Sequence, residues 1–287
     1  MASMRDIKRR RSSIQGTQQI TKAMKLVSTV KLQRARANAE RSKSYFTCMY
    51  DTVNSILKRV GHIEHRYLLP GDSRKKAVIV ITSNRGLAGG YNSNVIKLVT
   101  RNPEWNKEDV VVYTLGNKGR EAFNRYGYEV KNCNSDIVES PVYADAMALS
   151  NELLGAFAAG EVGEIYLAYT AFKNTVSHVP TLLKLLPVEY TGEAEQKSEK
   201  AEAIMNFEPE DVEALDLILP KYMTSLIYGA LMESVASENG ARMQAMDNAT
   251  SNAEEMISDL SLKYNRARQG SITQELTEII AGAEALG

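Results

Sequence analysis

The segment with the clearest potential for chemistry is glycine-rich, TSNRGLAGG at residues 82–90. It follows an apolar, β-branched run and precedes residues suited to a helix. Turns of this kind, between a strand and a helix, bind phosphates in nucleotide folds. The segment matches neither GxGxxG nor GxxxxGK[ST], and no GxSxG elbow surrounds Ser83. We therefore interpret Gly86, Gly89 and Gly90 as residues of a tight structural turn, with a nucleotide site as the alternative.

Few other groups could support catalysis or metal binding. The three histidines do not form a ligand cluster, since His62 and His65 are joined only by Glu64. The two cysteines, Cys48 and Cys133, are far apart in sequence and form no CxxC motif. A disulfide framework is therefore not expected, and a reducing cytosol fits. We predict no catalytic residue, no metal and no cofactor on this chain.

The formal net charge of zero conceals a strongly basic N-terminal region. Residues 5–43 carry twelve Lys and Arg against two acids and contain no aromatic residue. An anionic partner is expected. Without aromatic side chains to stack on bases, an acidic protein fits better than nucleic acid. The alternatives are a nucleotide-binding enzyme whose basic coiled-coil arm binds nucleic acid, and a purely structural coiled-coil scaffold.

The C-terminal fifth of the chain, residues 231–283, has the pattern of a long helix that packs on another helix. It contains no proline, and alternating steps of three and four residues predict a helical seam. The predicted seam residues are Met232, Ala236, Asn239, Met243, Met246, Thr250, Ala253, Ile257, Leu260, Tyr264 and Ala267. Because several are small or polar, this rod needs a partner helix and further cover.

Residues 3–59 predict a second long helix, since they contain no proline and one glycine, Gly16. The helix should stop near Gly61. Its expected packing stripe comprises Ile20, Ala23, Met24, Val27 and Val30, widened by Leu26 and Leu32. The simplest arrangement is an antiparallel coiled coil built from the two ends of the chain.

The central region alternates between strand and helix patterns, which predicts a mainly parallel sheet. Expected strands cover residues 76–83, 110–116, 128–131, 164–172 and 179–190, the last two paired as a hairpin; expected helices cover 95–102, 117–127 and 144–160. Pro209 suits a first helical turn, and Pro220 should kink or restart the helix.

The predicted fold class is therefore α/β plus coiled coil: two long terminal helices in an antiparallel coiled coil, with an inserted Rossmann-like α/β domain. The boundaries are 1–60 for the N-terminal helix, 74–190 for the α/β domain, 191–208 for a mobile acidic loop and 209–287 for the C-terminal helix. No run of about 18 uncharged apolar residues is present, so no bilayer insertion is expected. No apolar stretch follows the basic start, which argues against a secretory signal.

Three motifs resemble one family, the γ subunits of F-type ATP synthases. SIQGTQQITKAMKLVSTVKLQRAR (13–36) is similar to that family's N-terminal helix. SENGARMQAMDNATSNAEEMI (237–257) and YNRARQGSITQELTEIIAGA (264–283) resemble its C-terminal helix. SNRGLAGGYN is similar to its S-D-R-G-L-x-G-G-x-N loop, except that Asn84 replaces the usual Asp. The similarity runs from about residue 3 to 286, and no regulatory cysteine insertion is present.

This resemblance implies a central rotor rather than an enzyme. The coiled coil would stand among three α and three β subunits, with Mg-ATP and Mg-ADP bound by those partners. The ε subunit and the membrane c-ring would bind the lower part, and nucleic acid would not. Rotation would couple proton translocation to ATP synthesis or hydrolysis. The expected location is peripheral, at the cytoplasmic face of a bacterial plasma membrane.

The resemblance also assigns partner-binding roles to individual residues. On the N-terminal helix, the basic face would pass acidic β-subunit loops, and Met24 matches a coupling-sensitive methionine. On the C-terminal helix, the motif marks hydrogen-bonding positions to a β-subunit loop. The expected partner-binding residues are Arg9, Arg10, Met24, Lys25, Arg34, Arg36, Arg268, Gln269, Thr273 and Glu275.

Overall fold

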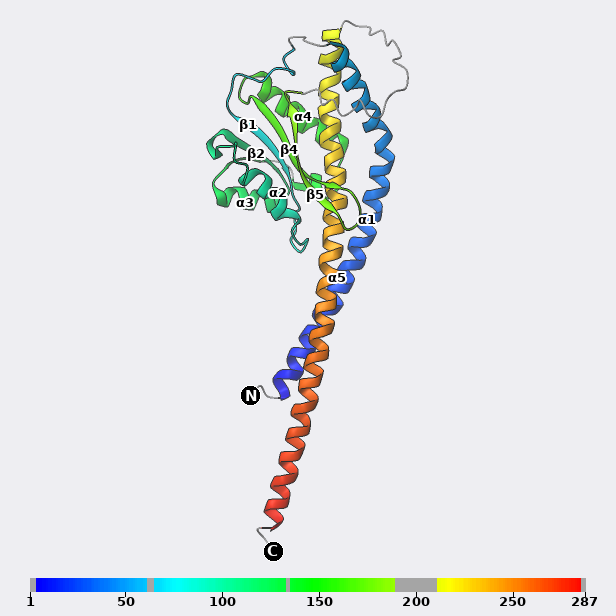
Figure 1. The fold of residues 1–287 in the computed structure, drawn as a ribbon, viewed down its shortest axis with the longest axis vertical. Helices are drawn as coiled ribbons and strands as arrows, with labels where there is room; N and C mark the ends of the chain where they lie inside the picture. The colour runs from blue at the N-terminus through cyan, green and yellow to red at the C-terminus, as the bar shows by residue number, and fades with distance from the viewer. Residues whose placement is uncertain (1–3, 61–64, 133–134, 189–210, 285–287) are drawn as a thin grey trace. The chain divides into compact units, whose positions relative to one another are not determined.

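The computed structural model describes residues 4–60, 65–132, 135–188 and 211–284, and Figure 1 shows their elements. Two long helices lie at the ends of the sequence, α1 (Met4–Val60) and α5 (Asp211–Glu284). The chain divides into two compact units, residues 1–29 with 242–287 (unit 1) and residues 30–241 (unit 2). No helix in the described ranges is long and apolar enough to cross a membrane.

The two units divide the chain differently from the boundaries inferred from sequence. Those boundaries follow the ends of the long helices, whereas the units are separated within α1 and within α5. The end of α1 at Val60 agrees with the stop predicted near Gly61. The acidic segment 191–208 and Pro209 lie outside the described residues.

Unit 2 is built on a five-stranded sheet. Its strands are β1 (Lys76–Ile81), β2 (Val110–Leu115), β3 (Glu129–Asn132), β4 (Glu164–Phe172) and β5 (His178–Leu186). They lie in the order β3-β2-β1-β4-β5, and all neighbours are parallel except the antiparallel β4–β5 pair. The Rossmann-like domain and its terminal hairpin are therefore confirmed. Every residue of β2 is buried, as expected for a strand covered on both faces.

Helices cover both faces of this sheet (Figure 1). On one face, α2 (Tyr91–Thr100) and α3 (Asn117–Tyr126) pack on Val78, Val80 and Val112. On the other, α4 (Tyr143–Ala158) packs on Ile79 and Ile81. Because successive side chains of a strand point to opposite faces, the apolar run of β1 supplies both cores. Two short 3-10 helices, η1 (Lys107–Asp109) and η2 (Ser135–Val138), complete the described elements.

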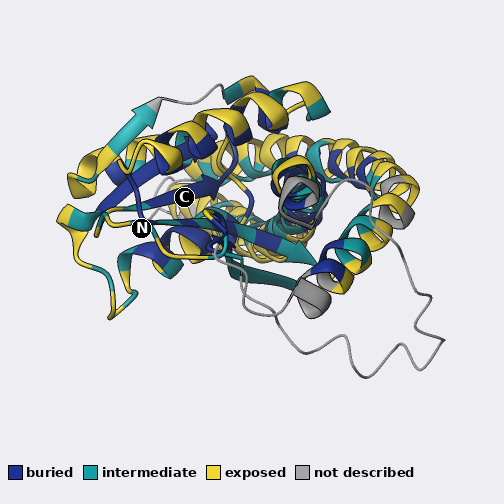
Figure 2. Ribbon diagram, turned by 90° about the horizontal axis from the view of Figure 1, so that it is seen from above, coloured by how far each residue is buried: buried dark blue, intermediate teal, exposed yellow. Residues whose placement is uncertain are grey.

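The first part of α5 belongs to the core of unit 2. Residues spaced by four along it join the α4-side cluster: Leu215, Leu219, Met223, Ile227 and Leu231. Figure 2 colours the ribbon by burial, with buried residues in dark blue. At Pro220 we expected a kink or a restart of the helix. The restart is wrong, because α5 is a single helix from Asp211 to Glu284 that continues through Pro220. The buried side chains of Leu219 and Met223 hold this part of the helix against the domain.

Unit 1 is an antiparallel pair of helices. Residue numbers on α5 fall as those on α1 rise, because Arg11 lies over the Tyr264 ring, Thr21 contacts Thr250 and Lys25 pairs with Asp247. The predicted seam of α5 is confirmed within this unit. Met246, Thr250 and Ala253 are buried, and the remaining seam residues are half-buried between exposed neighbours.

Most of the stripe predicted on α1 is wrong. Ile20, Leu26, Val27 and Val30 are 63%, 62%, 57% and 48% exposed, and Ala23 is exposed as well, whereas Met24 is half-buried and Leu32, in unit 2, is buried. The residues shielded in unit 1 include a series with three-and-four spacing: Ile7, Arg11, Ile14, Gln18, Thr21, Lys25 and Ser28. Met4, Met24 and Thr29 are half-buried beside this series. The packed face of α1 therefore follows a heptad spacing, whereas the concentration of apolar residues had indicated a different face of this helix.

Candidate functional site

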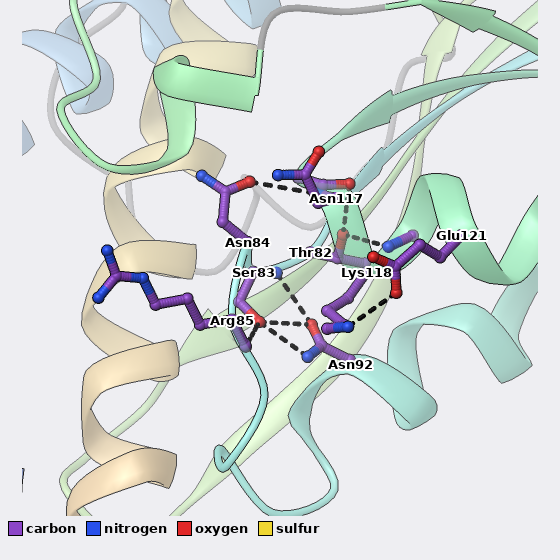
Figure 3. A network of polar contacts seen from close by, with 10 residues as sticks. Thr82, Ser83, Asn84, Arg85, Asn92, Asn117, Lys118 and Glu121 are labelled. Carbon is purple, nitrogen blue, oxygen red and sulfur yellow. Dashed lines mark hydrogen bonds and ion pairs between the residues drawn. The ribbon is translucent and has the colours of Figure 1, made fainter.

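The glycine-rich loop after β1 is tied to the N-terminus of α3 by a polar network, drawn in Figure 3. Asn117 N–H donates to Asn84 Oδ1 at 3.1 Å, and Lys118 N–H donates to the Ser83 carbonyl at 3.1 Å. Gly119 N–H donates to Thr82 Oγ1 at 2.9 Å. Free N–H groups at a helix start are what bind phosphate. These three are already satisfied, so the start of α3 is not available for a nucleotide.

Ser83 is held inside the same network and is not placed as a nucleophile. Its hydroxyl donates to the Arg85 carbonyl at 2.5 Å and accepts from Asn92 Nδ2 at 2.8 Å. Its backbone N–H donates to Asn92 Oδ1 at 2.9 Å. The side chain is fully buried, and its hydrogen-bond partners include no histidine or carboxylate to take a proton. The loop geometry therefore stabilises a strand-to-helix connection.

The glycines of this loop differ in what the backbone demands. Gly89 has φ of +56°, a left-handed conformation that favours glycine, whereas Gly86 and Gly90 do not have positive φ. Leu87 has φ of +64° although it is not glycine, and its side chain is 63% exposed. The backbone approaches this loop most closely at Gly116, just before α3. There φ is +103°, and a side chain would overlap the Thr82 carbonyl.

Asn84, at the position where the resemblance expects Asp, uses both ends of its amide. Oδ1 accepts from Asn117, and Nδ2 donates to the Ser135 carbonyl at 2.9 Å. A carboxylate could accept the first bond but could not donate the second. Asn84 therefore joins the loop, α3 and η2 in a way that an ionised Asp could not.

A surface cleft of about 390 Å³ lies at the other end of the strands, beside Ser73, Val111 and Val162. Its charged walls are paired, since Lys75 lies 3.4 Å from Glu129 and Lys131 lies 3.8 Å from Glu161. Ligands of open α/β sheets bind at the carboxyl ends of the strands, not at this end. In the described ranges, no group of three or more His, Cys, Asp or Glu could hold a metal ion.

The expected partner-binding residues of α1 fall into three environments. Arg9, Arg10 and Arg34 are exposed, as is Arg36, which pairs with Glu40 on its own helix at 2.9 Å. Met24 is half-buried. Lys25 faces α5, where its Nζ lies 2.6 Å from Asp247 Oδ1. Arg34 and Arg36 belong to unit 2 and the others to unit 1.

The expected residues of α5 all lie on the exposed surface of unit 1. Arg268, Gln269, Thr273 and Glu275 are each exposed, and Thr273 donates to the Gln269 carbonyl within the helix at 2.9 Å. Within the described part of the chain Arg268 pairs with no carboxylate. The helix presents large apolar side chains in the same region: Ile272, Leu276, Ile279 and Ile280, which are 49%, 54%, 68% and 59% exposed.

The sequence did not predict the contact between Thr21 of α1 and Thr250 of α5. The two hydroxyl oxygens are 2.8 Å apart and buried, in the middle of the helix pair. A heptad assignment starting at Ile7 would have placed Thr21 in the seam, opposite the predicted position of Thr250. The apolar stripe through Ile20 masked that signal.

Comparison with known proteins agrees with this architecture. A family model described as ATP synthase matches residues 3–286. The chain is 64% identical over its full length to the full-length ATP synthase gamma chain of Lachnoclostridium phytofermentans. It is 40% identical to the sodium ion specific ATP synthase gamma chain of Acetobacterium woodii, over 99% of both chains.

Solved structures show the same fold. A chain of the Euglena gracilis mitochondrial ATP synthase matches with a TM-score of 0.64 at 18% identity, covering 99% of this chain and 94% of that one. A chain from the Tetrahymena thermophila central stalk and c-ring matches with a TM-score of 0.57 at 24% identity, covering 80% and 99%.

An α/β domain inserted between long helices, with the N–H groups at the start of α3 already bonded within the domain and apolar side chains exposed along the helix pair, defines a protein that acts by binding other chains. The chain belongs to the ATP synthase γ-chain family, the rotor subunits of that complex.

Proposed function

We propose that unit 1 turns inside a ring of three α and three β subunits, and that ATP is made or hydrolysed on the β subunits. Rotation would couple proton translocation through the membrane sector to that chemistry. In this proposal Mg-ATP and Mg-ADP are bound by α and β, and this chain binds no cofactor. The ε subunit and the membrane c-ring are the remaining partners, at the cytoplasmic face of a bacterial plasma membrane.

The observation that carries this proposal is the exposed apolar surface of unit 1. Ile20 and Val27 on α1 and Ile279 and Ile280 on α5 are each more than half exposed. A helix that is stable in water normally turns such residues inward. An apolar surface on several sides of a helix pair requires a partner that surrounds it. The near-neutral end of α5 suits a sleeve, in which strong polar contacts would resist rotation.

The basic residues of α1 suit contacts that must form and break. Exposed ion pairs contribute about 0–1 kcal/mol each. Arg9, Arg10, Arg34 and Arg36 can therefore pass acidic loops of β without trapping the rotor at one angle. Lys25 would have to leave Asp247 to take part.

The residues of α5 suit a more selective contact. A hydrogen bond to a charged group contributes about 1.5–3 kcal/mol, which is enough to distinguish one rotor angle from another. Arg268 and Gln269 would bind a β-subunit loop, with Thr273 and Glu275 in the same region. All four are exposed and available for this role.

The proposal is tested by mixing the purified chain with separately purified α and β subunits and recording a native mass spectrum. One copy per three α and three β supports the central-shaft arrangement. Nucleotide or RNA retained by the chain alone, without a complex, would favour the enzyme alternative. The satisfied N–H groups at the start of α3 argue against that outcome.

A further inference from the structure

The middle of the unit 1 helix pair is joined by a chain of polar contacts. The Thr21 and Thr250 hydroxyl oxygens lie 2.8 Å apart, and either one can donate to the other. Each is also within hydrogen-bond distance of a carbonyl on its own helix, Thr21 of Gln18 at 3.0 Å and Thr250 of Met246 at 2.7 Å. Only 8% of Thr21 and 9% of Thr250 is exposed. On either side, Lys25 Nζ lies 2.6 Å from Asp247, and Gln18 Nε2 donates to Glu254 at 3.1 Å.

The more apolar face of α1 is turned away from these contacts. Ile20 and Val27 each come one position before a buried residue, Thr21 and Ser28 respectively. One position on a helix corresponds to a rotation of about 100°. Rotating α1 by that amount about its own axis would bring Ile20, Met24 and Val27 against α5. Over residues 18–28, hydrophobic burial alone favours that rotated arrangement, although Ile7 and Ile14, which the observed packing shields, would leave the seam. The structure has the other arrangement.

We propose that Thr21 and Thr250, supported by the contact of Lys25 with Asp247, select which face of α1 packs on α5. They act as positioning residues, because a polar pair in a coiled-coil seam specifies one arrangement at a cost in stability. A rotated α1 would bury an apolar surface against α5 and break the buried contact between the two hydroxyls. The selected arrangement keeps Ile20 and Val27 outside, available to a surrounding partner.

This inference goes beyond the proposed function and does not require it, because it concerns the free chain. The test replaces Cys48 and Cys133 by serine and introduces one cysteine pair at a time. Gln18→Cys with Glu254→Cys reports the observed packing, since these side chains are in contact. Thr17→Cys with Glu254→Cys reports the rotated packing, because residue 17 would take the place of residue 18.

Disulfide yields are compared for three versions of the full chain: the natural threonines, Thr21→Val with Thr250→Val, and Thr21→Ser with Thr250→Ser. Valine keeps the shape of threonine without the hydroxyl, and serine keeps the hydroxyl. We expect the ratio of 17–254 to 18–254 yield to rise about 5- to 30-fold in the valine version and to stay unchanged in the serine version. Circular dichroism checks that helix content is equal.

Three outcomes would overturn the proposal: an unchanged ratio in the valine version, an equal rise in the serine version, or loss of both disulfides at full helix content. The last would mean that the threonines hold the helices together rather than choose a face. If the double valine version does not fold, Thr250→Val alone removes the hydroxyl that contacts Thr21 and must shift the ratio in the same direction. Failure to assemble with α and β would instead bear on the proposed function.

Discussion

The imidazole of His178, on β5, lies against Gly240 of α5, and any side chain at residue 240 would come too close to Nε2. Nε2 is buried and has no hydrogen-bond partner among the described residues. The β4 strand of the same hairpin makes two hydrogen bonds with α5. Phe172 N–H donates to Glu233 at 3.2 Å, and Ser237 Oγ donates to the Thr170 carbonyl at 3.1 Å. The hairpin and the helix therefore share a desolvated contact with titratable groups.

This contact predicts that unit 2 loses stability in mild acid. Burial lowers the pKa of His178, and burial lowers the pKa of His65 despite the opposing effect of Asp216. The native state thus binds these protons more weakly than the unfolded chain, whose histidine pKa is about 6.5. Their contribution is present above that pH and is lost as the pH falls below it, by at most about 1.4 kcal/mol per pH unit for each histidine. Burial raises the pKa of Glu233, which acts in the opposite direction.

Urea unfolding at pH 7.5 and 5.5 measures the effect, with His178→Gln as the test and His178→Gln with His65→Gln as its extension. The free energy of unfolding should fall less on acidification in the single variant than in the natural chain, and least in the double variant. Equal losses in all three would mean that these histidines do not determine the acid response.

Asn84→Asp should destabilise the isolated chain. The carboxylate keeps the bond from Asn117 but faces the Ser135 carbonyl without a proton to donate. The lost bond costs about 1–3 kcal/mol, and the helix dipole of α3 returns about 0.3–1 kcal/mol. Urea unfolding at pH 7 should therefore show a net loss, which shrinks near pH 4 as the acid regains its proton. The exposed Asn151→Asp on α4 is the control and should change little.

Gly116→Ala should be among the most damaging single changes. A methyl group at φ of +103° is strained, and it would also overlap the Thr82 carbonyl. We expect a loss of more than about 3 kcal/mol in the free energy of unfolding. Gly16→Ala is the matched control, since no atom lies within 4 Å of its added carbon. That helical site should gain up to about 1 kcal/mol, and a similar loss at both sites would contradict the geometry.

Most of the fold could be predicted from sequence because each strand is recognisable from its own short apolar segment. The buried apolar run of β1 and the β4 segment lie where their residue patterns place them. The packed face of α1 could not be found in this way. Hydrophobicity indicated Ile20 and Val27, but those side chains are exposed in the free chain. In the proposed complex a surrounding partner would cover them, and in sequence such residues resemble core residues.

The candidate surface was harder to predict than the fold for a related reason. Nothing in the spacing of Arg268 and Gln269 distinguishes a contact residue from any other exposed polar residue, so their assignment depended on family resemblance. By contrast, the structural role of the loop at 82–90 followed from its failure to match a phosphate motif. The polar network around Asn84 then supplied the physical reason.

Arg268→Ala combined with Gln269→Ala should weaken assembly or ATPase activity of the reconstituted complex and leave the isolated chain folded, because both side chains are exposed. Losing a charged hydrogen bond of about 1.5–3 kcal/mol corresponds to a reduction of about 10- to 150-fold in affinity at that contact. Lys263→Ala with Gln274→Ala removes the same two types of side chain from exposed positions on the opposite side of the helix and serves as the control. Normal assembly and turnover in the test variant would remove the proposed role.

Met24→Lys should impair coupling more than folding. Met24 is half-buried, and the new ammonium group would stand beside Lys25 on an already basic helix. The measurement is protons pumped per ATP hydrolysed in reconstituted vesicles, with Met24→Leu as the size-matched control. A ratio equal to that of the natural complex would count against a coupling role for this residue.

The last turns of α5 extend past the end of its partner. Arg11 stands level with Tyr264, so the described start of α1 at Met4 is level with about residue 271, and residues 272–283 are all exposed. A helical stretch of only about 12 residues is marginal in water, even when the turns before it supply the nucleus. In the free chain this helix end should fray, so its amide hydrogens should exchange rapidly with solvent. They should become protected when partner subunits cover this end of the helix. Hydrogen exchange at this end would therefore report, residue by residue, how much of α5 the proposed α and β partners cover.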